Sequence, residues 1–338
     1  MQSFGILGAF LLILISGVLN GSAAAPLKYA KHSEWENLWF VQTIVAMLLF
    51  PWVLVWATIP QPIAVFRNSS GPALAAAAGF GFGWGFGTLL YIIGVVMVGM
   101  SVSFAIILSL TATLGSLLPL IVQHPQDLRS WRGHLLMASL AITILGIGLC
   151  ALAGAARTQE EPSPAPEQAV RHFWQGIIVC VLSGIFSPML NFAFAFGEPI
   201  TSAARKLGTS PVWAANGLWA IALSAAFGLN AVYCLWRLGL STSCTRFLDA
   251  PWENLVAGSM MGLLFFVSVI TYGIGADKLG HWGTSTGWAI YMCATVFIAN
   301  LWGIATGEWR NAPKKSYVFL GAGLLAITVA IILAASAS

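Results

Sequence analysis

The sequence predicts an all-α integral membrane protein, on three observations. Of its 338 residues, 58% are hydrophobic and only 8% are charged, whereas a soluble protein carries roughly 25% charged residues because its surface faces water. Apolar runs recur along the whole chain, and each is long enough to cross a hydrocarbon core of ~30 Å at ~1.5 Å per residue. Charged residues, Pro and Gly gather in the breaks between these runs. A soluble fold is therefore excluded.

The breaks divide the chain into ten expected transmembrane helices. Each begins and ends where charged residues, Pro or Gly interrupt an apolar run. The expected spans are residues 4–27, 38–59, 72–97, 100–122, 133–155, 173–197, 211–239, 252–275, 283–306 and 316–336.

The first span has to be distinguished from a signal peptide, because the small residues from Ser22 to Ala25 resemble a cleavage site. No Lys or Arg precedes the apolar run. The run is also longer than the apolar part of a typical signal peptide. We therefore expect this segment to be a retained helix.

The third span, 72–97, carries Gly at every second position from Gly79 to Gly87. This pattern superficially resembles a dinucleotide-binding loop, but no strand precedes it. It favours close approach between helices and local bending. The fourth span, 100–122, adds hydroxyl side chains at helical spacing, namely Ser109, Thr113 and Ser116.

A polar stretch, residues 157–172, follows the fifth span. It contains several Glu and Pro residues and has the composition of a flexible linker. It divides the chain into a first five-helix repeat, residues 1–156, and a second, residues 173–338.

The two halves resemble each other in short stretches that occur in the same order. An odd number of crossings inserts the second copy upside down relative to the first, and inverted repeats of this kind surround the central site of many secondary transporters. The pattern therefore predicts alternating access. The matches pair Ser16, Gly17, Leu38, Trp39, Gly81, Tyr91, Gly94, Gly99, Ala105 and Leu140 with Ser183, Gly184, Leu218, Trp219, Gly262, Tyr272, Gly275, Gly280, Ala289 and Leu325.

Polar side chains inside the bilayer are costly and usually face the interior of the bundle. In the sixth span, Ser183, Ser187 and Asn191 recur at steps of four residues, and Glu198 follows seven residues later. This spacing predicts one polar helix face. Pro188 within it removes a backbone hydrogen bond and leaves a carbonyl that needs a partner.

Large aromatic and amide side chains indicate the class of ligand. Most of the fifteen Trp residues lie near span ends, as interfacial anchors do, but Trp84 lies at mid-span. A mid-span Trp stacks on the C–H face of a sugar while amides bond its hydroxyls, and no mid-membrane Arg or Lys is available for an anion. For Ser and Thr, packing and backbone bonding are the commoner alternative. The candidate substrate-binding residues are Asn20, Gln42, Trp84, Thr88, Tyr91, Ser187, Asn191, Asn216, Tyr272, Trp288 and Tyr291.

The sequence lacks the residues that other classes of function require. No His lies in the interior of a span, and no paired acids or Cys/His set is present there, so we expect no enzyme, no metal site and no bound cofactor. Basic residues lie in short loops rather than in a run that binds nucleic acid. Nine of the fifteen Lys and Arg residues lie on the side of both termini, which favours termini outside the cytoplasm.

Glu198 is the candidate for ion coupling, because it continues the polar face and precedes Pro199. Partial burial there would favour its protonated form. Two alternatives stay open. Glu198 could be a solvated residue paired with Arg205 or Lys206, or sodium could couple through carbonyl and hydroxyl oxygens instead.

Seven short stretches occur in an order that is typical of one transporter family. They are Pro26 to Lys28, Trp35 to Trp39, Phe50 to Trp52, Phe82 to Gly85, Gly99 to Ser101, Gly184 to Ser187 and Glu308 to Ala312. With these stretches the chain resembles the L-rhamnose–proton symporter family of the drug/metabolite transporter superfamily. The resemblance implies ten helices in two inverted repeats, a bacterial inner membrane, and uptake of a deoxy-sugar with a proton. The chain departs from the family pattern at Thr88 to Leu90, where an Asn is expected, and at Glu198, where a basic residue is expected.

The expected function is proton-coupled import of a neutral monosaccharide, L-rhamnose or a related deoxy-sugar, by alternating access. An exporter of small amphipathic metabolites or drugs on the same fold, and sodium-coupled sugar uptake, are the alternatives. The expected partners are the sugar, the coupling ion and the lipid bilayer. The sequence leaves open whether the protein is a monomer or a homodimer.

Overall fold

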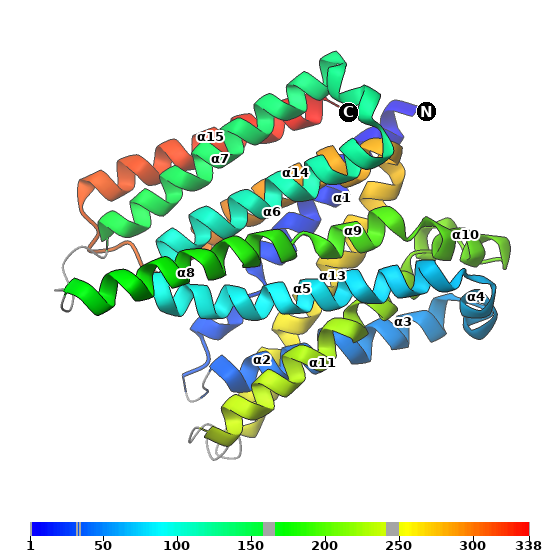
Figure 1. Cartoon of the computed structure of the whole chain (residues 1–338), viewed down its shortest axis with the longest axis horizontal. Helices are drawn as coiled ribbons and strands as arrows, with labels where there is room; N and C mark the ends of the chain where they lie inside the picture. The colour runs from blue at the N-terminus through cyan, green and yellow to red at the C-terminus, as the bar shows by residue number, and fades with distance from the viewer. Residues whose placement is uncertain (1, 32, 34, 158–165, 241–249, 338) are drawn as a thin grey trace.

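The computed structural model describes residues 2–31, 33, 35–157, 166–240 and 250–337, and this part of the chain is all helical. Figure 1 shows α7 and α15 side by side along one edge of the bundle, with α2, α3 and α11 along the opposite edge. The first half contains α1 (Gln2–Ser22), η1 (Ala25–Lys28), α2 (Trp35–Thr43), η2 (Ile44–Leu49), α3 (Phe50–Thr58), α4 (Pro62–Asn68), α5 (Gly71–Val98), α6 (Met100–Gln123), η3 (Pro125–Arg129) and α7 (Trp131–Arg157).

The second half begins with α8, at a residue that the sequence assigned to the linker. The rest of that linker, residues 158–165, lies outside the described residues. The elements are α8 (Pro166–Phe186), α9 (Met189–Phe196), α10 (Glu198–Lys206), η4 (Pro211–Trp213), α11 (Asn216–Leu240), α13 (Pro251–Leu279), η5 (Gly280–Trp282), η6 (Gly283–Gly287), α14 (Trp288–Ala305) and α15 (Lys314–Ser336).

Within the described residues, nine stretches are long and apolar enough to cross a membrane. One of them, Pro251–Ala305, has 55 residues and includes both α13 and α14. A helix of that length would be more than twice as long as a ~30 Å hydrocarbon core requires. The count is therefore compatible with the ten expected spans, of which 252–275 and 283–306 are joined in this stretch.

The sixth expected span, 173–197, is not the continuous helix that the sequence predicted. Helix α8 ends at Phe186 and α9 begins at Met189, so the break falls at Ser187 and Pro188. Pro188 has no N–H to donate to the helix ladder, which explains why the break lies here.

Helix α5 shows how local sequence sets the limits of a span. The side chain of Ser70 accepts a hydrogen bond from the backbone N–H of Ala73 and caps the first turn. The helix ends at Gly99, whose φ of 81° is rarely adopted by residues with a Cβ atom. Gly280, its counterpart in the second half, has a φ of 62° and follows α13 in the same way. A positive φ after each of the two helices is compatible with the predicted repeat.

Helix packing is compatible with two repeats, because exchanging each helix for its counterpart reproduces the contacts. Helix α1 packs against α13, and α8 packs against α5. Helix α2 contacts α13 as α11 contacts α5, and α6 contacts α8 as α14 contacts α1. Two helix pairs, α7 with α15 and α2 with α11, join counterparts to each other.

The matched glycines Gly81 and Gly262 lie at equivalent contacts between helices. A Cβ atom on Gly81 of α5 would lie 2.0 Å from the carbonyl oxygen of Ala222 in α11. A Cβ atom on Gly262 of α13 would lie 3.0 Å from Val45 in η2. The expectation that the glycine run permits close approach between helices is therefore confirmed at Gly81, and Gly262 lies at a similarly close contact.

Candidate functional site

Asn191 lies at the start of α9, just after the break, and is fully buried. Its Nδ2 atom donates hydrogen bonds to the carbonyl oxygens of Gly115 in α6, at 2.9 Å, and Thr284 in η6, at 2.8 Å. Its Oδ1 atom accepts a hydrogen bond from the hydroxyl of Tyr272 in α13, at 2.6 Å. One amide therefore joins α9 to three other elements, and both of its N–H donors are occupied.

Tyr272, which donates to this amide, packs against two further aromatic rings, and we call the three rings and Asn191 the tyrosine cluster. The centroid of the Tyr272 ring lies 5.5 Å from that of Trp288 and 5.1 Å from that of Tyr291, and the last two are 5.2 Å apart. The indole N–H of Trp288 donates to the carbonyl oxygen of Thr111 in α6 at 3.0 Å. Four residues predicted as substrate-binding are thus in one place.

Small residues and an irregular turn make room for the tyrosine cluster. A Cβ atom on Gly115 would lie 2.1 Å from Nε1 of Trp288, so a larger residue would displace the indole. The turn η6, with the sequence GTSTG, is a π-helix whose Thr284 carbonyl accepts from Asn191. π-Helical turns are frequent at functional sites.

A second polar group, which we call the Asn230 cluster, consists of Trp39, Thr88 and Asn230. The Oδ1 atom of Asn230 accepts hydrogen bonds from Thr88 Oγ1 at 3.2 Å and from the indole N–H of Trp39 at 3.3 Å. Asn230 is fully buried, and its Nδ2 donates to the carbonyl oxygen of Ala226 at 3.1 Å. The sequence analysis missed Asn230, although an amide inside the span 211–239 was an available signal.

A row of aromatic side chains connects the tyrosine cluster to the region of the Asn230 cluster. Phe194 contacts the ring of Tyr272, at 6.1 Å between centroids, and stacks on Trp219 at 5.2 Å. Trp219 and Trp84 belong to one buried core. Trp84 lies one helical turn before Thr88 and stacks on Phe265 at 5.4 Å.

The other predicted binding residues have separate contacts. Asn20 Nδ2 donates to Thr295 Oγ1 at 3.3 Å, and Asn216 Nδ2 donates to Thr58 Oγ1 at 2.8 Å. Tyr91 stacks on Phe104, with ring centroids 5.6 Å apart.

Gln42 and Ser187 are the last two predicted binding residues. Gln42 is buried in α2, and its Oε1 atom has no hydrogen-bond partner among the described residues. Ser187 lies at the break between α8 and α9, where its backbone N–H donates to the Ser183 carbonyl oxygen. Binding by all eleven candidates stays a prediction.

Glu198 does not continue the polar face of the sixth span. Helix α9 ends at Phe196, and Glu198 lies in the first turn of the separate helix α10, where it is exposed. The expectation of partial burial is therefore wrong, because the break at Pro188 and the stop at Gly197 change the direction of the chain. The role of Glu198 in coupling stays a prediction.

Ion pairs lie in the loops and at the helix ends. Glu308 pairs with Lys28 and, at 3.2 Å, with Arg157. Burial acts to raise the pKa of the Glu308 carboxyl, but the hydrogen bonds and charges of Lys28 and Arg157 outweigh it, so the pKa is lowered. Further pairs join Arg205 to Asp277 at 2.5 Å, His281 to Asp127 at 3.4 Å and Arg237 to Glu36 at 2.8 Å.

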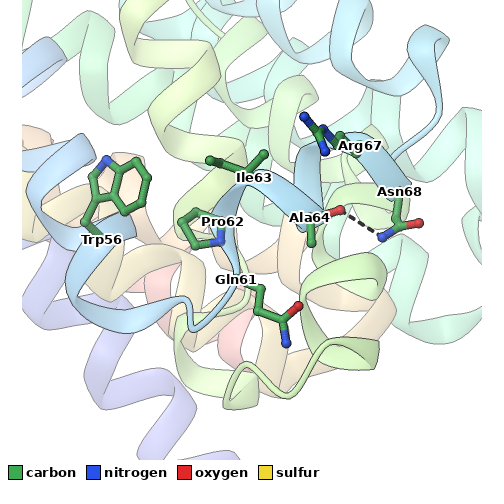
Figure 2. A pocket seen from close by; sticks show the side chains of 7 residues that line it. All are labelled: Trp56, Gln61, Pro62, Ile63, Ala64, Arg67 and Asn68. Carbon is green, nitrogen blue, oxygen red and sulfur yellow. Dashed lines mark hydrogen bonds between the residues drawn. The ribbon is translucent and has the colours of Figure 1, made fainter.

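An open hollow of about 490 Å³ lies at the turn between α3 and α4 (Figure 2). Trp56 at its edge is 63% exposed. None of the predicted binding residues lines it, so we do not assign the substrate site to this surface. Its lining residues are Trp56, Gln61, Pro62, Ile63, Ala64, Arg67 and Asn68.

The side chains described by the structure include no group of three or more His, Cys, Asp or Glu residues that could hold a metal ion. The hydrogen-bonding groups of both clusters are neutral amides, hydroxyls and indoles. This arrangement suits a neutral ligand with several hydroxyl groups.

Comparison with known proteins identifies relatives along the whole chain. A family model described as L-rhamnose-proton symport protein matches residues 1–337. L-rhamnose-proton symporters from Klebsiella pneumoniae subsp. pneumoniae and Salmonella typhi are each 26% identical over 314 residues. The symporter from an Enterobacter species is 25% identical over 314 residues. In each case the match covers 90% of both chains.

Proposed function

Because the chain belongs to the L-rhamnose-proton symport protein family, we propose that it imports L-rhamnose or a closely related deoxy-sugar together with protons. The family match over residues 1–337 carries this proposal. The protein is a multi-pass membrane transporter and not an enzyme. The proposed location is the inner membrane of a bacterium, as expected for relatives from enterobacteria.

The proposed sugar position lies along the aromatic row between the tyrosine cluster and the Asn230 cluster. A deoxy-sugar has an apolar methyl group and C–H faces, which stack on aromatic rings, and hydroxyls that need donors and acceptors. Trp84, Trp219 and Tyr272 supply the rings, and Asn191 and Asn230 supply the amides. The neutral character of these groups supports a neutral sugar over an anionic substrate.

Alternating access follows from the proposed pair of inverted repeats. In this structure the Asn191 amide is bonded to protein groups, so a sugar hydroxyl has to replace one of those partners. Sugar binding then favours a conformation in which the exchange is possible, which couples occupancy to movement of the helices. The equivalent packing of the two halves supports two such conformations of similar energy.

A thermal-shift titration of the purified protein tests the choice of sugar. A ligand that binds only the folded state raises its apparent stability as the ligand concentration exceeds the dissociation constant. We expect L-rhamnose to raise the melting temperature. L-mannose, which differs only by a hydroxyl in place of a hydrogen on the methyl carbon, is the matched control and should have a smaller effect. No shift with L-rhamnose at concentrations that saturate transport would contradict the proposal.

A further inference from the structure

Glu36, in the first turn of α2, has a side chain that is only 5% exposed. The side chains of Asp127, Glu308 and Asp277, which also form ion pairs, are 24%, 39% and 44% exposed. Oε1 of Glu36 lies 2.8 Å from Nη2 of Arg237, near the end of α11. Taking a carboxylate out of water is costly, so a buried one in a membrane protein usually has a function.

Glu36 has a partly exposed partner on one side and a buried polar group nearby on the other. The side chain of its partner Arg237 is 39% exposed and lies over the ring of Trp35 at 5.9 Å. On the other side, Trp39 follows Glu36 by three residues on the same helix face and donates to Asn230. The carboxyl therefore lies next to a partly exposed arginine and about one helical turn from Trp39 of the Asn230 cluster.

Other ionisable groups lie on the helices that pack against the start of α2. On α11, Tyr233 and Cys234 are close enough to interact with the charge of Glu36. On α13, Glu253 accepts a hydrogen bond at 3.4 Å from Ser33, which precedes Glu36 by three residues. Among these groups, Arg237 carries the positive charge that faces the Glu36 carboxylate.

The repeat gives Glu36 a neutral counterpart. The match of Leu38 and Trp39 with Leu218 and Trp219 aligns Glu36 with Asn216, at the start of α11. Asn216 donates to Thr58 at the end of α3, at 2.8 Å. The membrane-spanning stretch Trp35–Thr58, which includes α2 and α3, is thus joined to α11 by an ion pair at one end and by a neutral hydrogen bond at the other. Protonation of Glu36 therefore changes the contact at one end, whereas the Asn216–Thr58 hydrogen bond at the other end does not depend on it.

We propose that Glu36 carries the coupled proton, and that its ion pair with Arg237 holds one end of the transporter closed. This inference rests on the proposed proton-coupled uptake. With Glu36 ionised, the ion pair holds the start of α2 against the end of α11. A proton that enters from this end forms the O–H bond of the carboxylic acid, and the ion pair is lost. Water then hydrates the partly exposed Arg237, and the two helix ends separate.

Return to the closed state completes the proton path. With sugar bound and Glu36 still protonated, the first end closes and the opposite end opens. The Glu36 carboxylic acid then gives up the same proton to water that enters from that side. The carboxylate re-forms and pairs with Arg237, which holds the first end closed. One proton therefore crosses for each cycle, and the sugar crosses with it. A buried charge left without its partner is strongly destabilising, which opposes opening while Glu36 is ionised.

The test uses the full chain in proteoliposomes, with Glu36→Gln as a permanently neutral variant. Asp277→Asn is the matched control, because it also removes the acid of an arginine ion pair, at an exposed position. Three quantities are measured with L-rhamnose: accumulation driven by a pH gradient, exchange at equal concentrations on both sides, and alkalinisation of the medium when sugar is added. We expect Glu36→Gln to retain exchange within about threefold while losing accumulation and alkalinisation. Asp277→Asn should keep all three.

The possible outcomes separate this inference from the proposed function. If the wild-type protein accumulates no L-rhamnose and moves no protons, the proposed function fails. If the wild type does both and Glu36→Gln does as well, Glu36 is not the proton carrier. Loss of exchange together with accumulation in a folded Glu36→Gln protein also overturns the inference, because the neutral form should still cycle with sugar. Should Glu36→Gln fail to fold, Glu36→Asp replaces it and must keep accumulation, with a changed pH dependence.

Discussion

Trp84 of α5 stacks almost parallel on Phe265 of α13, with 5.4 Å between ring centroids and 7° between ring planes. One face of the Trp84 indole is therefore covered by protein. The whole Trp84 residue is only 9% exposed, so the proposed sugar would reach the other face only when the surrounding core opens. The two rings come from counterpart helices of the two halves, so the stack joins one half to the other.

Replacing Trp84 by Ala should weaken L-rhamnose binding by roughly tenfold or more, because stacking of a ring on the ligand is lost. Isothermal calorimetry on the detergent-purified variant measures the change. Trp174→Ala is the control, since Trp174 is 62% exposed on α8. Wild-type affinity in Trp84→Ala would place the sugar elsewhere.

Asn191→Ala should reduce the affinity for L-rhamnose by about five- to hundredfold, the effect of losing a buried hydrogen bond worth about 1–3 kcal/mol. It should also lower the melting temperature, because the carbonyls of Gly115 and Thr284 lose their donor. Asn300→Ala is the control, since the Asn300 amide donates to Val296 of its own helix. An Asn191→Ala protein that is destabilised but binds sugar normally would make this amide purely structural.

Glu198→Gln separates two hypotheses about coupling. The sequence-based hypothesis predicts that this variant loses accumulation driven by a pH gradient but keeps sugar exchange. The Glu36 proposal predicts that it keeps both, because Glu198 is exposed at the start of α10. Uptake into proteoliposomes distinguishes the two. A requirement for sodium with no effect of the pH gradient would contradict both.

The ion pairs of Glu308 with Lys28 and Arg157 should make the stability of the protein depend on pH. Its folded-state pKa lies below the ordinary value of 4.5, because Lys28 and Arg157 outweigh the effect of burial. The ion pairs therefore stabilise the fold above about pH 4.5, and this contribution is lost as the pH falls through the lowered pKa. Glu308→Gln should reduce the melting temperature by roughly 1–3 °C at pH 7, since exposed pairs contribute little. The difference should shrink below pH 4. A melting-temperature difference that grows below pH 4 would contradict the lowered pKa of Glu308.

Gly81→Ala should destabilise the protein by about 1–3 kcal/mol, because the added Cβ atom would overlap the backbone of Ala222. Gly79→Ala is a close control within the same glycine run, since a Cβ atom there meets nothing within 4 Å. Thermal unfolding in detergent compares the two variants. Equal stability of both variants would show that α5 and α11 can move apart at this contact without lowering the free energy of unfolding.

The sequence predicted the spans well because hydrophobic length is a strong local signal, as α5 shows by matching the expected 72–97 almost residue for residue. It also named both Asn191 and Tyr272 as candidate binding residues, and the structure joins the two by a hydrogen bond. It did not predict that the Asn191 amide binds the backbone carbonyls of Gly115 and Thr284, because carbonyl oxygens have no residue identity to read.

Long-range pairing was the other limit of the sequence analysis. Glu36 and Arg237 are 201 residues apart, and neither has a neighbour in the sequence that indicates the other. Glu198 was favoured because helical spacing was extended across Pro188 and Gly197. Spacing identifies one face only while the helix continues, and here it stops twice.

If the sugar binds at the proposed site, the bonds that Asn191 makes to protein groups also limit how tightly it is held. Every internal hydrogen bond that a sugar hydroxyl replaces is subtracted from the net free energy of binding, so part of the interaction is an exchange rather than a gain. The same internal partners re-form as the sugar departs, which lowers the barrier to its release. A transporter gains turnover from such a site, whereas a binding protein with an unsatisfied amide at this position would retain its ligand.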